Sequence, residues 1–358
     1  MADAGDAVVQ RLLSEAQRLW PAAPPVAITI AQKVSRPYST VYRLHLANRV
    51  EASAAQRPAV LYAKIFRPSA HNLHNQQKYL DRLQIEFEIA EQLHAALQGQ
   101  SHFGVVRPVV YYPELLALVT EEAQGRVLAE IVAEACKHWS LRNALERAVL
   151  HCRRAGQALA AMQAATRVAG SFDCNELFEY IKIRLQRLLE SEAAPFSAAD
   201  HKLVLNFLER ALTNIPTDQL AQCGCHCDYA PFNVLADDER VTVLDFSMFK
   251  IGSCYNDATY FHHRLEGYLH KPIFSASAIQ AAQRAFLEGY NYACARANHP
   301  IENDLLFRVL WTKHVINNYS AIMRNRVGRG LRLPSATRMF NRHIFRRYNN
   351  WLMRMCRV

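Results

Sequence analysis

The sequence has no long apolar run and no basic leader segment. No apolar stretch reaches the ~18 residues that a membrane-spanning helix needs. Near the N-terminus, Asp3 and Asp6 stand where a secretory signal would carry basic residues. These absences argue against a membrane-spanning or secreted chain. We therefore expect a cytoplasmic protein.

The chain also lacks an even, closely spaced set of cysteines. Its nine cysteines are scattered over 358 residues, which favours reduced thiols over a disulfide framework. One local cluster consists of Cys223, Cys225 and Cys227. On a strand these side chains would share one face, and that arrangement does not match the spacing of a tetrahedral zinc site. We expect them to be small packing residues, and a zinc site is the less favoured alternative.

Residues 324–358 lack lysine, aspartate and glutamate but contain ten arginines. These arginines account for the whole formal net charge of +10, so the charges of the preceding residues balance. At about 100° per residue, the apolar side chains between residues 335 and 357 fall on one side of a helix. The pattern therefore predicts a basic amphipathic helix over residues 335–357.

Two interpretations of the 335–357 helix remain open. In the first, its apolar face packs against the rest of the protein and the arginines face water. In the second, the arginines bind an anionic partner. That partner would be an anionic membrane surface, which would make the protein peripheral to the membrane, or an acidic substrate such as a phosphorylated glycan. No nucleic-acid-binding motif accompanies the arginines, so we expect no nucleic acid.

Composition and periodicity predict a soluble globular chain with two lobes. Hydrophobic residues make up 51% and charged residues 21%, and this length suits two lobes of one unit better than several modules. Apolar spacing predicts a leading helix over residues 5–19. The predicted strands are 26–30, 40–46, 59–66, 103–113 and 115–120. From residue 126 onward the pattern is helical, with predicted helices at 139–167, 172–190, 197–215 and 305–323.

The most informative stretch runs from His226 to Asn233 and has the pattern H-x-D-x4-N. A second aspartate, Asp245, follows a short apolar hairpin with a polar turn. Transfer of a γ-phosphoryl group needs a carboxylate to orient or deprotonate the acceptor hydroxyl, and oxygen ligands for Mg²⁺. Asp228 suits the first role, as the catalytic base. Asn233 and Asp245 suit the second role, as metal ligands.

The chain resembles the aminoglycoside phosphotransferase and choline kinase family, a small-molecule branch of the protein-kinase fold, in the segments HCDYAPFNVL and VTVLDF. Cys227 departs from the family, in which this position is most often glycine. The resemblance extends over residues 26–323. It implies an α+β, two-lobed protein-kinase-like fold, with an N-lobe of antiparallel sheet plus helix in residues 1–122 and a mainly helical C-lobe in residues 123–358. It also implies that Asp257 braces the catalytic loop.

Lys64 lies inside an apolar predicted strand, where an unpaired ammonium group would be costly. We therefore expect it to have a buried anionic partner. The resemblance implies two partners, the phosphates of ATP and a glutamate on the next helix, which is predicted over residues 81–97. Glu86 together with Leu93 matches the family's E-x6-L pattern, and Glu88 is the alternative. Lys64 on an exposed strand face is the plainer interpretation.

Two further parts of the nucleotide site rest on the resemblance. The turn before the second strand has no glycine, and the family often uses serine or asparagine there, so Ser39 and Thr40 are the candidates for phosphate contact. An ordinary hairpin turn is the alternative. Residues 121–125 resemble the hinge that binds adenine through backbone groups, which assigns the backbones of Glu121 and Ala123 to this role.

Together the motifs predict an ATP- and Mg²⁺-dependent phosphotransferase that acts on a hydroxyl of a small molecule or glycan. A catalytically silent, kinase-like nucleotide-binding scaffold anchored by its basic tail is the alternative, and the intact motif residues argue against it. A protein kinase is a weaker alternative, because no A-P-E segment follows Asp245.

The motifs do not specify the acceptor. Choline would call for an aromatic and acidic cage and aminoglycosides for an acidic cleft, and the sequence shows neither. We therefore expect a neutral or anionic acceptor such as a sugar. The resemblance places the acceptor pocket in the segments after residue 257. Its candidate lining residues, for each of which a packing or surface role is the alternative, are His262, His263, Arg264, Trp311 and His314.

Overall fold

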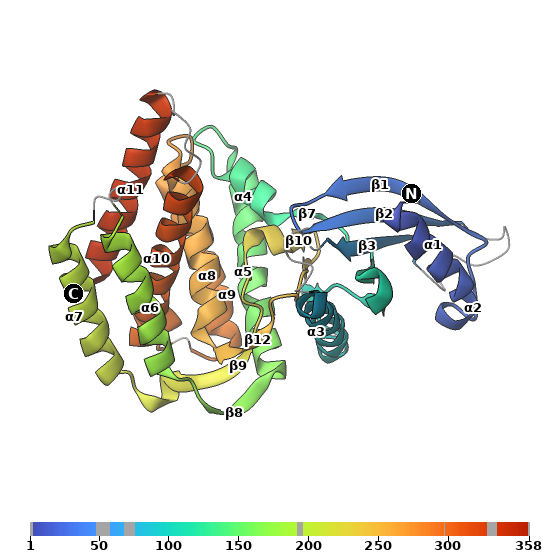
Figure 1. Cartoon of the computed structure of the whole chain (residues 1–358), viewed down its shortest axis with the longest axis horizontal. Coiled ribbons are helices and arrows are strands. Elements are labelled where there is room, and N and C mark those ends of the chain that lie inside the picture. Colours follow the sequence, from blue (N-terminus) through green and yellow to red (C-terminus); the bar gives the residue numbers. More distant parts are fainter. Residues whose placement is uncertain are drawn as a thin grey trace. The chain divides into compact units, whose positions relative to one another are not determined.

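The computed structural model describes residues 3–47, 58–67, 76–191, 196–296, 298–327 and 335–356, and of residues 323–327 and 335–341 the helical backbone alone. The chain forms two compact units (Figure 1). The first comprises Met1–Arg126 and Asn233–Phe249, and the second Val127–Phe232 and Lys250–Val358. Residues 233–249 were predicted to belong to the C-lobe. This segment belongs to the first unit because one of its strands pairs with a strand of that unit.

The first unit is built on a five-stranded sheet with the strand order β1-β2-β3-β6-β5, in which all neighbours are antiparallel. The strands are β1 (Ala27–Ser35), β2 (Ser39–Ala47), β3 (Val60–Phe66), β5 (Pro108–Tyr112) and β6 (Ala117–Glu121). Of the strand predicted over residues 103–113, only the second part joins this sheet. The first part forms β4 (Phe103–Val105), which belongs to another sheet.

That second sheet has four strands in the order β4-β11-β10-β7. The predicted hairpin is present as β10 (Val234–Ala236) and β11 (Val241–Val243), which pair antiparallel. β11 also pairs with β4 in parallel, and β7 (Arg126–Val127) forms the opposite edge. Asp245 follows β11 after one residue, so the second sheet positions it.

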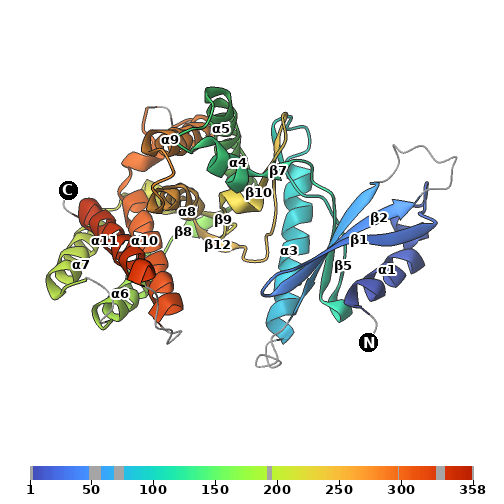
Figure 2. The ribbon, with the colours of Figure 1, turned by 90° about the horizontal axis from the view of Figure 1, so that it is seen from above.

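Helices cover both faces of the five-stranded sheet (Figure 2). They are α1 (Ala4–Ser14) and α2 (Ala16–Leu19) on one face and α3 (Gln76–Ala96) on the other. Leu61, Ala63 and Ile65 of β3 belong to the core under α1, whereas Phe66 belongs to the core under α3. Side chains alternate along a strand, so Lys64 shares the side of Phe66. The lysine therefore lies on the face that α3 covers.

The second unit is mainly helical (Figure 1). Its helices are α4 (Leu128–Ala135), α5 (Arg142–Ala165), α6 (Cys174–Leu189), α7 (Ala198–Thr213), α8 (Tyr255–Glu266), α9 (Ala276–Ala293), α10 (Leu305–Val327) and α11 (Ser335–Cys356). It also contains a three-stranded sheet that the sequence analysis did not predict. The strands are β8 (Arg167–Ser171), β9 (Ala221–Cys225) and β12 (Lys250–Ser253), in the order β12-β9-β8.

The cysteine cluster does not lie on one strand. β9 ends at Cys225, and Cys227 follows it in a loop with a left-handed φ of 62°. The expectation that three sulfurs share one strand face is therefore wrong, because the chain turns into the loop after Cys225. Cys223 and Cys225 are buried packing residues, and the Cys225 thiol donates to the carbonyl oxygen of Ser253.

Two glycines allow α5 and α9 to cross at very short range. A Cβ atom on Gly156 would lie 2.0 Å from the carbonyl oxygen of Phe286, and a Cβ atom on Gly289 would lie 2.1 Å from the carbonyl oxygen of Arg153. Only glycine permits such an approach at both positions. The crossing sets the position of Phe286, whose ring stacks on Phe261 of α8 with the centroids 4.1 Å apart.

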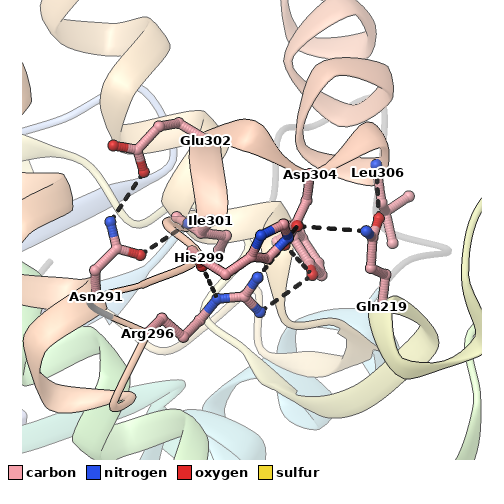
Figure 3. A network of polar contacts seen from close by, with 9 residues as sticks. Gln219, Asn291, Arg296, His299, Ile301, Glu302, Asp304 and Leu306 are labelled. Carbon is pink, nitrogen blue, oxygen red and sulfur yellow. Dashed lines mark hydrogen bonds and ion pairs between the residues drawn. The ribbon is translucent and has the colours of Figure 1, made fainter.

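A buried carboxylate organises the connection between α9 and α10 (Figure 3). Asp304 accepts hydrogen bonds from Gln219 and from the hydroxyl of Tyr255. It also pairs with Arg296 and His299, which lie in the same connection. A buried charge requires such partners. This network ties the start of α10 to the start of α8.

The apolar side of α11 is buried in the second unit. Tyr348 stacks on Tyr319 of α10 with the centroids 5.5 Å apart, and Trp351 meets the edges of His263 and Trp311. Burial lowers the pKa of His263 to about 3, so this side chain is a neutral packing group at neutral pH. The first interpretation of this helix, that its apolar face packs against the rest of the protein, is therefore confirmed. Within the described ranges, no helix is both long and apolar enough to cross a bilayer.

The arginines of α11 gather at a cavity of about 760 Å³, whose lining includes Arg346, Arg347, Arg354 and His343. None of the predicted reaction residues lines it. An anionic membrane surface stays a prediction, and it would depend on these arginines because the apolar side is already buried. Arg342 is exposed. The side chains of the other six arginines of residues 324–358 lie outside the described residues; they are Arg324, Arg326, Arg329, Arg332, Arg338 and Arg357.

We expect Gly156→Ala to destabilise the second unit by about 2–4 kcal/mol, because the added methyl group meets the backbone of α9 and the two helices must separate. Urea denaturation with circular dichroism measures the change. Gly267→Ala is the control, since a Cβ there meets nothing within 4 Å, and it should change stability by less than about 0.5 kcal/mol. Equal stability of the two variants would contradict the close crossing.

Candidate active site

One buried carboxylate holds the backbone of the H-x-D-x4-N loop. Asp257 accepts hydrogen bonds from the backbone N–H groups of His226 at 2.6 Å and Cys227 at 2.9 Å. Its side chain is fully buried, which raises its pKa, and these hydrogen bonds oppose that effect. The expected bracing role of Asp257 is confirmed.

Asp228 lies between two anchored neighbours in this loop. Its own N–H donates to Nδ1 of His226 at 3.3 Å. The next residue, Tyr229, is fully buried and donates its hydroxyl to the carbonyl oxygen of Ala155 in α5 at 2.7 Å. Tyr260 of α8 donates to Oδ1 of Asp228 at 3.0 Å. The carboxylate is therefore oriented by the loop backbone and by a tyrosine hydroxyl.

Lys64, Glu86 and Asp245 come together in the first unit. The Lys64 Nζ atom lies 3.0 Å from both carboxylate oxygens of Glu86 and 2.8 Å from Oδ1 of Asp245. Glu88, the alternative partner, is exposed and accepts a hydrogen bond from Gln84 instead. The structure thus pairs Lys64 with a buried glutamate, and the plainer interpretation of an exposed lysine is wrong.

The pKa values of this cluster reflect its burial. Burial by itself would lower the pKa of Lys64, but the charges of Glu86 and Asp245 outweigh it and the net shift is upward. Burial raises the pKa of Glu86 to about 7, although Lys64 pulls it down. A protonated lysine between two carboxyl groups is the arrangement we infer at neutral pH.

Asn233 and Asp245 lie at the same end of the β10–β11 hairpin. Val234 pairs with Val243, and the N–H of Leu244 donates to the carbonyl oxygen of Asn233 at 2.9 Å. Asp245 has a left-handed φ of 65°, and its Oδ1 accepts a hydrogen bond from the hydroxyl of Ser247 at 2.7 Å. Left-handed backbone at a non-glycine residue is strained and is frequent at functional sites.

The donor set at the hairpin suits Mg²⁺ chemically. A carboxylate and a carboxamide offer hard oxygen ligands, which this ion prefers. Within the part of the chain that the structure describes, no group of three or more His, Cys, Asp or Glu side chains could hold a metal by itself. An ion held by Asn233 and Asp245 would therefore need further oxygen ligands, and nucleotide phosphates supply them in kinases.

The other predicted nucleotide contacts lie in the first unit. Ser39 and Thr40 begin β2, and both residues are buried. Glu121 ends β6, and its N–H donates to the carbonyl oxygen of Arg107 at 2.9 Å, so an adenine contact there would use its own carbonyl group. Ala123 follows in the connection to β7. The roles of these four residues in binding ATP stay predictions.

The predicted acceptor residues separate into two groups. His263, Trp311 and His314 are buried and pack in the core, and the Trp311 indole donates to Nδ1 of His262 at 3.2 Å. Arg264 instead lies beside the rings of Phe232 and Tyr260. The sequence analysis gave neither of these aromatic residues a role. Helical spacing could have found Tyr260, which precedes Arg264 by one turn.

We expect Cys227→Gly to stabilise the second unit by about 1 kcal/mol, because glycine adopts the left-handed backbone of this position without the steric cost of a Cβ atom. The free energy of unfolding in urea measures the gain. Cys227→Ala is the control, since it removes the thiol and keeps the Cβ. A glycine variant no more stable than the alanine variant would show that the backbone is not strained.

We expect Glu86→Gln to flatten the pH dependence of stability. The native pKa of about 7 lies above the ordinary value, so between about pH 4.5 and 7 the folded protein binds more protons than the unfolded chain. The contribution of Glu86 to stability is therefore fully present below this range and is lost as the pH rises, by at most about 1.4 kcal/mol per pH unit. Urea titrations at pH 5 and 7.5 without nucleotide measure the slope. The exposed control Glu88→Gln should keep the wild-type slope, and an unchanged slope in Glu86→Gln would refute the assignment.

Comparison with solved structures identifies the fold as protein-kinase-like. A candidate aminoglycoside phosphotransferase from Ralstonia eutropha is 14% identical, with 97% of this chain and 98% of that chain covered and a TM-score of 0.59. Choline kinase from Cryptosporidium parvum is 9% identical, with coverage of 98% and 96% and a TM-score of 0.57. A glucosamine kinase is 15% identical, with coverage of 96% and 85% and a TM-score of 0.56.

Comparison at the level of sequence gives the family. A search of curated proteins finds no match. The model of the phosphotransferase enzyme family matches residues 72–297, which is more than half of the chain and includes Glu86, the H-x-D-x4-N loop and Asp245. The chain therefore belongs to the phosphotransferase enzyme family.

Proposed function

We propose that this protein transfers the γ-phosphoryl group of ATP, in the presence of Mg²⁺, to a hydroxyl group of a small molecule or glycan. The observation that carries the proposal is the Lys64 ammonium group bound between Glu86 and Asp245 in the first unit. A buried lysine held by a helix glutamate and next to a metal-binding aspartate is the arrangement with which kinases hold nucleotide phosphates. Membership of the phosphotransferase enzyme family supports the same reaction type.

In this proposal the first unit binds the nucleotide. Lys64 donates hydrogen bonds to phosphate oxygens, and Glu86 keeps the ammonium group in place. Asn233 and Asp245 provide oxygen ligands for Mg²⁺, which, when bound, neutralises charge on the phosphates. Because Asp245 already contacts Lys64 at 2.8 Å, the cation and the metal ligand belong to one connected polar cluster.

The second unit provides the base. Asp228 would accept the proton of the acceptor hydroxyl as the new bond to phosphorus forms. The hydrogen bond from Tyr260 stabilises the ionised carboxylate and limits its rotation. The loop backbone, held by Asp257, gives Asp228 a defined position before any substrate binds.

A small-molecule acceptor is supported by the solved relatives. One is a choline kinase and another a glucosamine kinase in complex with glucosamine, ADP and inorganic phosphate. The catalytically silent scaffold is the alternative function. No contact of the described residues favours it, because Lys64, Glu86 and Asp245 form their ion pairs and the loop around Asp228 is braced.

We expect Asp228→Asn to lower kcat by about 10²–10⁴ and to leave ATP affinity within about threefold, because the amide keeps the shape of the side chain but cannot accept the proton. ADP release with Mg²⁺ and a panel of sugars, glycans, amino alcohols and aminoglycosides measures turnover, and isothermal titration calorimetry measures ATP binding. The control Asp238→Asn removes an exposed carboxylate in the hairpin turn and should change neither quantity.

Two results would contradict the proposed function. ATP binding without any acceptor-dependent ADP release would favour the silent scaffold. Turnover that is the same in wild type and in Asp228→Asn would remove the carboxylate from the role of base.

Loss of ATP binding in Asp245→Asn, with folding retained, is expected if this aspartate holds the metal.

A further inference from the structure

Arg264 is connected to the proposed base, Asp228, through one aromatic ring. It follows Tyr260 by four residues on α8, so the two side chains share one face of the helix. The guanidinium carbon lies 5.9 Å from the centroid of Tyr260 and 5.2 Å from that of Phe232, at the end of the catalytic loop. Tyr260 in turn donates to Oδ1 of Asp228.

The two rings hold the guanidinium group without neutralising its charge. A cation–π contact attracts the cation through the ring quadrupole and supplies no negative charge. Among the described residues, Arg264 forms no ion pair and no hydrogen bond. Glu266, the other charged residue near this end of α8, accepts a hydrogen bond from Gln283 at 2.9 Å. A half-buried arginine in this setting can bind an anion.

A second cation near the catalytic loop also has no carboxylate partner within the described part of the chain. Lys313 of α10 donates to Oδ1 of Asn256 at 2.6 Å, and Asn256 contacts the loop-bracing Asp257. Burial lowers the pKa of Lys313, and the nearby charge of Asp257 opposes this effect only in part. Arg264 and Lys313 are thus two cations of the second unit that form no direct ion pair among the described residues.

We propose that the acceptor carries an anionic group, a phosphate or a carboxylate, in addition to the hydroxyl group that is phosphorylated, and that Arg264 binds this anion. The inference rests on the proposed function, because it takes Asp228 as the base that the acceptor approaches. The planar guanidinium group donates paired hydrogen bonds to either anion. The acceptor is thus of a different class from the choline and glucosamine of the solved relatives.

Arg264 also explains how cationic acceptors would be rejected. A quaternary ammonium or amino sugar binds well where aromatic faces are open and acidic groups are near. Here the faces of Phe232 and Tyr260 are already in contact with a guanidinium group. A cationic acceptor would be repelled by the like charge of Arg264 and would have to displace this side chain. Such repulsion discriminates effectively between cationic and anionic acceptors.

Binding of four hexoses that differ in charge tests this assignment apart from turnover. The probes are glucose 6-phosphate, glucuronate, glucose and glucosamine, titrated into the full-length wild-type protein by calorimetry at low salt. We expect at least one anionic probe to bind about ten- to a hundredfold more tightly than glucose, and glucosamine to bind more weakly than glucose. The preference should shrink as ionic strength rises. The stronger anionic probe distinguishes phosphate from carboxylate.

Variants separate anion binding from a packing role. Arg264→Gln should abolish the preference for the anionic probe, and Arg264→Lys should retain part of it because the charge remains. The control Arg284→Gln removes an exposed arginine of α9 and should keep the wild-type ratio. A purely structural Arg264 would lower the melting temperature and leave the ratio between anionic and neutral probes unchanged.

The outcomes distinguish this inference from the proposed function. If neither anionic probe binds more tightly than glucose, or if the preference survives in Arg264→Gln, the inference is wrong, and ADP release with another acceptor would still support the kinase. If an anionic probe binds through Arg264 but no acceptor stimulates ADP release, the anion site stands and the proposed reaction falls.

Discussion

The buried carboxylate of Asp257 is the constraint on which the second unit's chemistry depends. It accepts hydrogen bonds from the backbone N–H groups of the two residues directly before Asp228. Such a group is costly to bury, and its pKa is raised for that reason. The hydrogen bonds from these N–H groups offset part of the cost of burying the carboxylate. They also hold a loop that contains Cys227 in a left-handed conformation. A strained turn with a defined shape results, and it presents Asp228 beside the hydroxyl of Tyr260.

The packing of the helices supports the same loop through Tyr229. Gly156 and Gly289 let α5 and α9 cross so closely that Phe286 reaches Phe261. Tyr229 packs against both of these rings, and its hydroxyl donates a hydrogen bond to the backbone of α5. The residue next to the proposed base is therefore part of the hydrophobic core. This explains how a small glycine contact far from Asp228 in the sequence can influence the position of the base.

In the first unit, two carboxyl groups keep a half-buried lysine charged. Strand alternation puts Lys64 on the side of α3, and Glu86 and Asp245 supply the compensating charge. One carboxylate comes from the helix and the other from the end of a hairpin in a second sheet. Two carboxyl groups from different elements therefore share one ammonium group.

The features that depend on local pattern could be predicted from the sequence. The alternation of β1, β2 and β3, the helical spacing of α6, α7 and α10, and the H-x-D-x4-N motif were all legible, because periodicity and motif spacing are properties of neighbouring residues. A buried lysine required an anion, so the Lys64–Glu86 pair could be anticipated from a strand and a helix. The bracing by Asp257 was implied by family resemblance.

The contacts between distant segments became visible in the tertiary structure. It moved β4 out of the main sheet into parallel pairing with β11, and it formed the β8–β9–β12 sheet, which no local pattern announces. It also turned the apolar side of α11 inward and placed Arg264 beside the rings of Phe232 and Tyr260. Strand partners and the charge around a side chain depend on which segments meet in space, and a linear pattern does not record that.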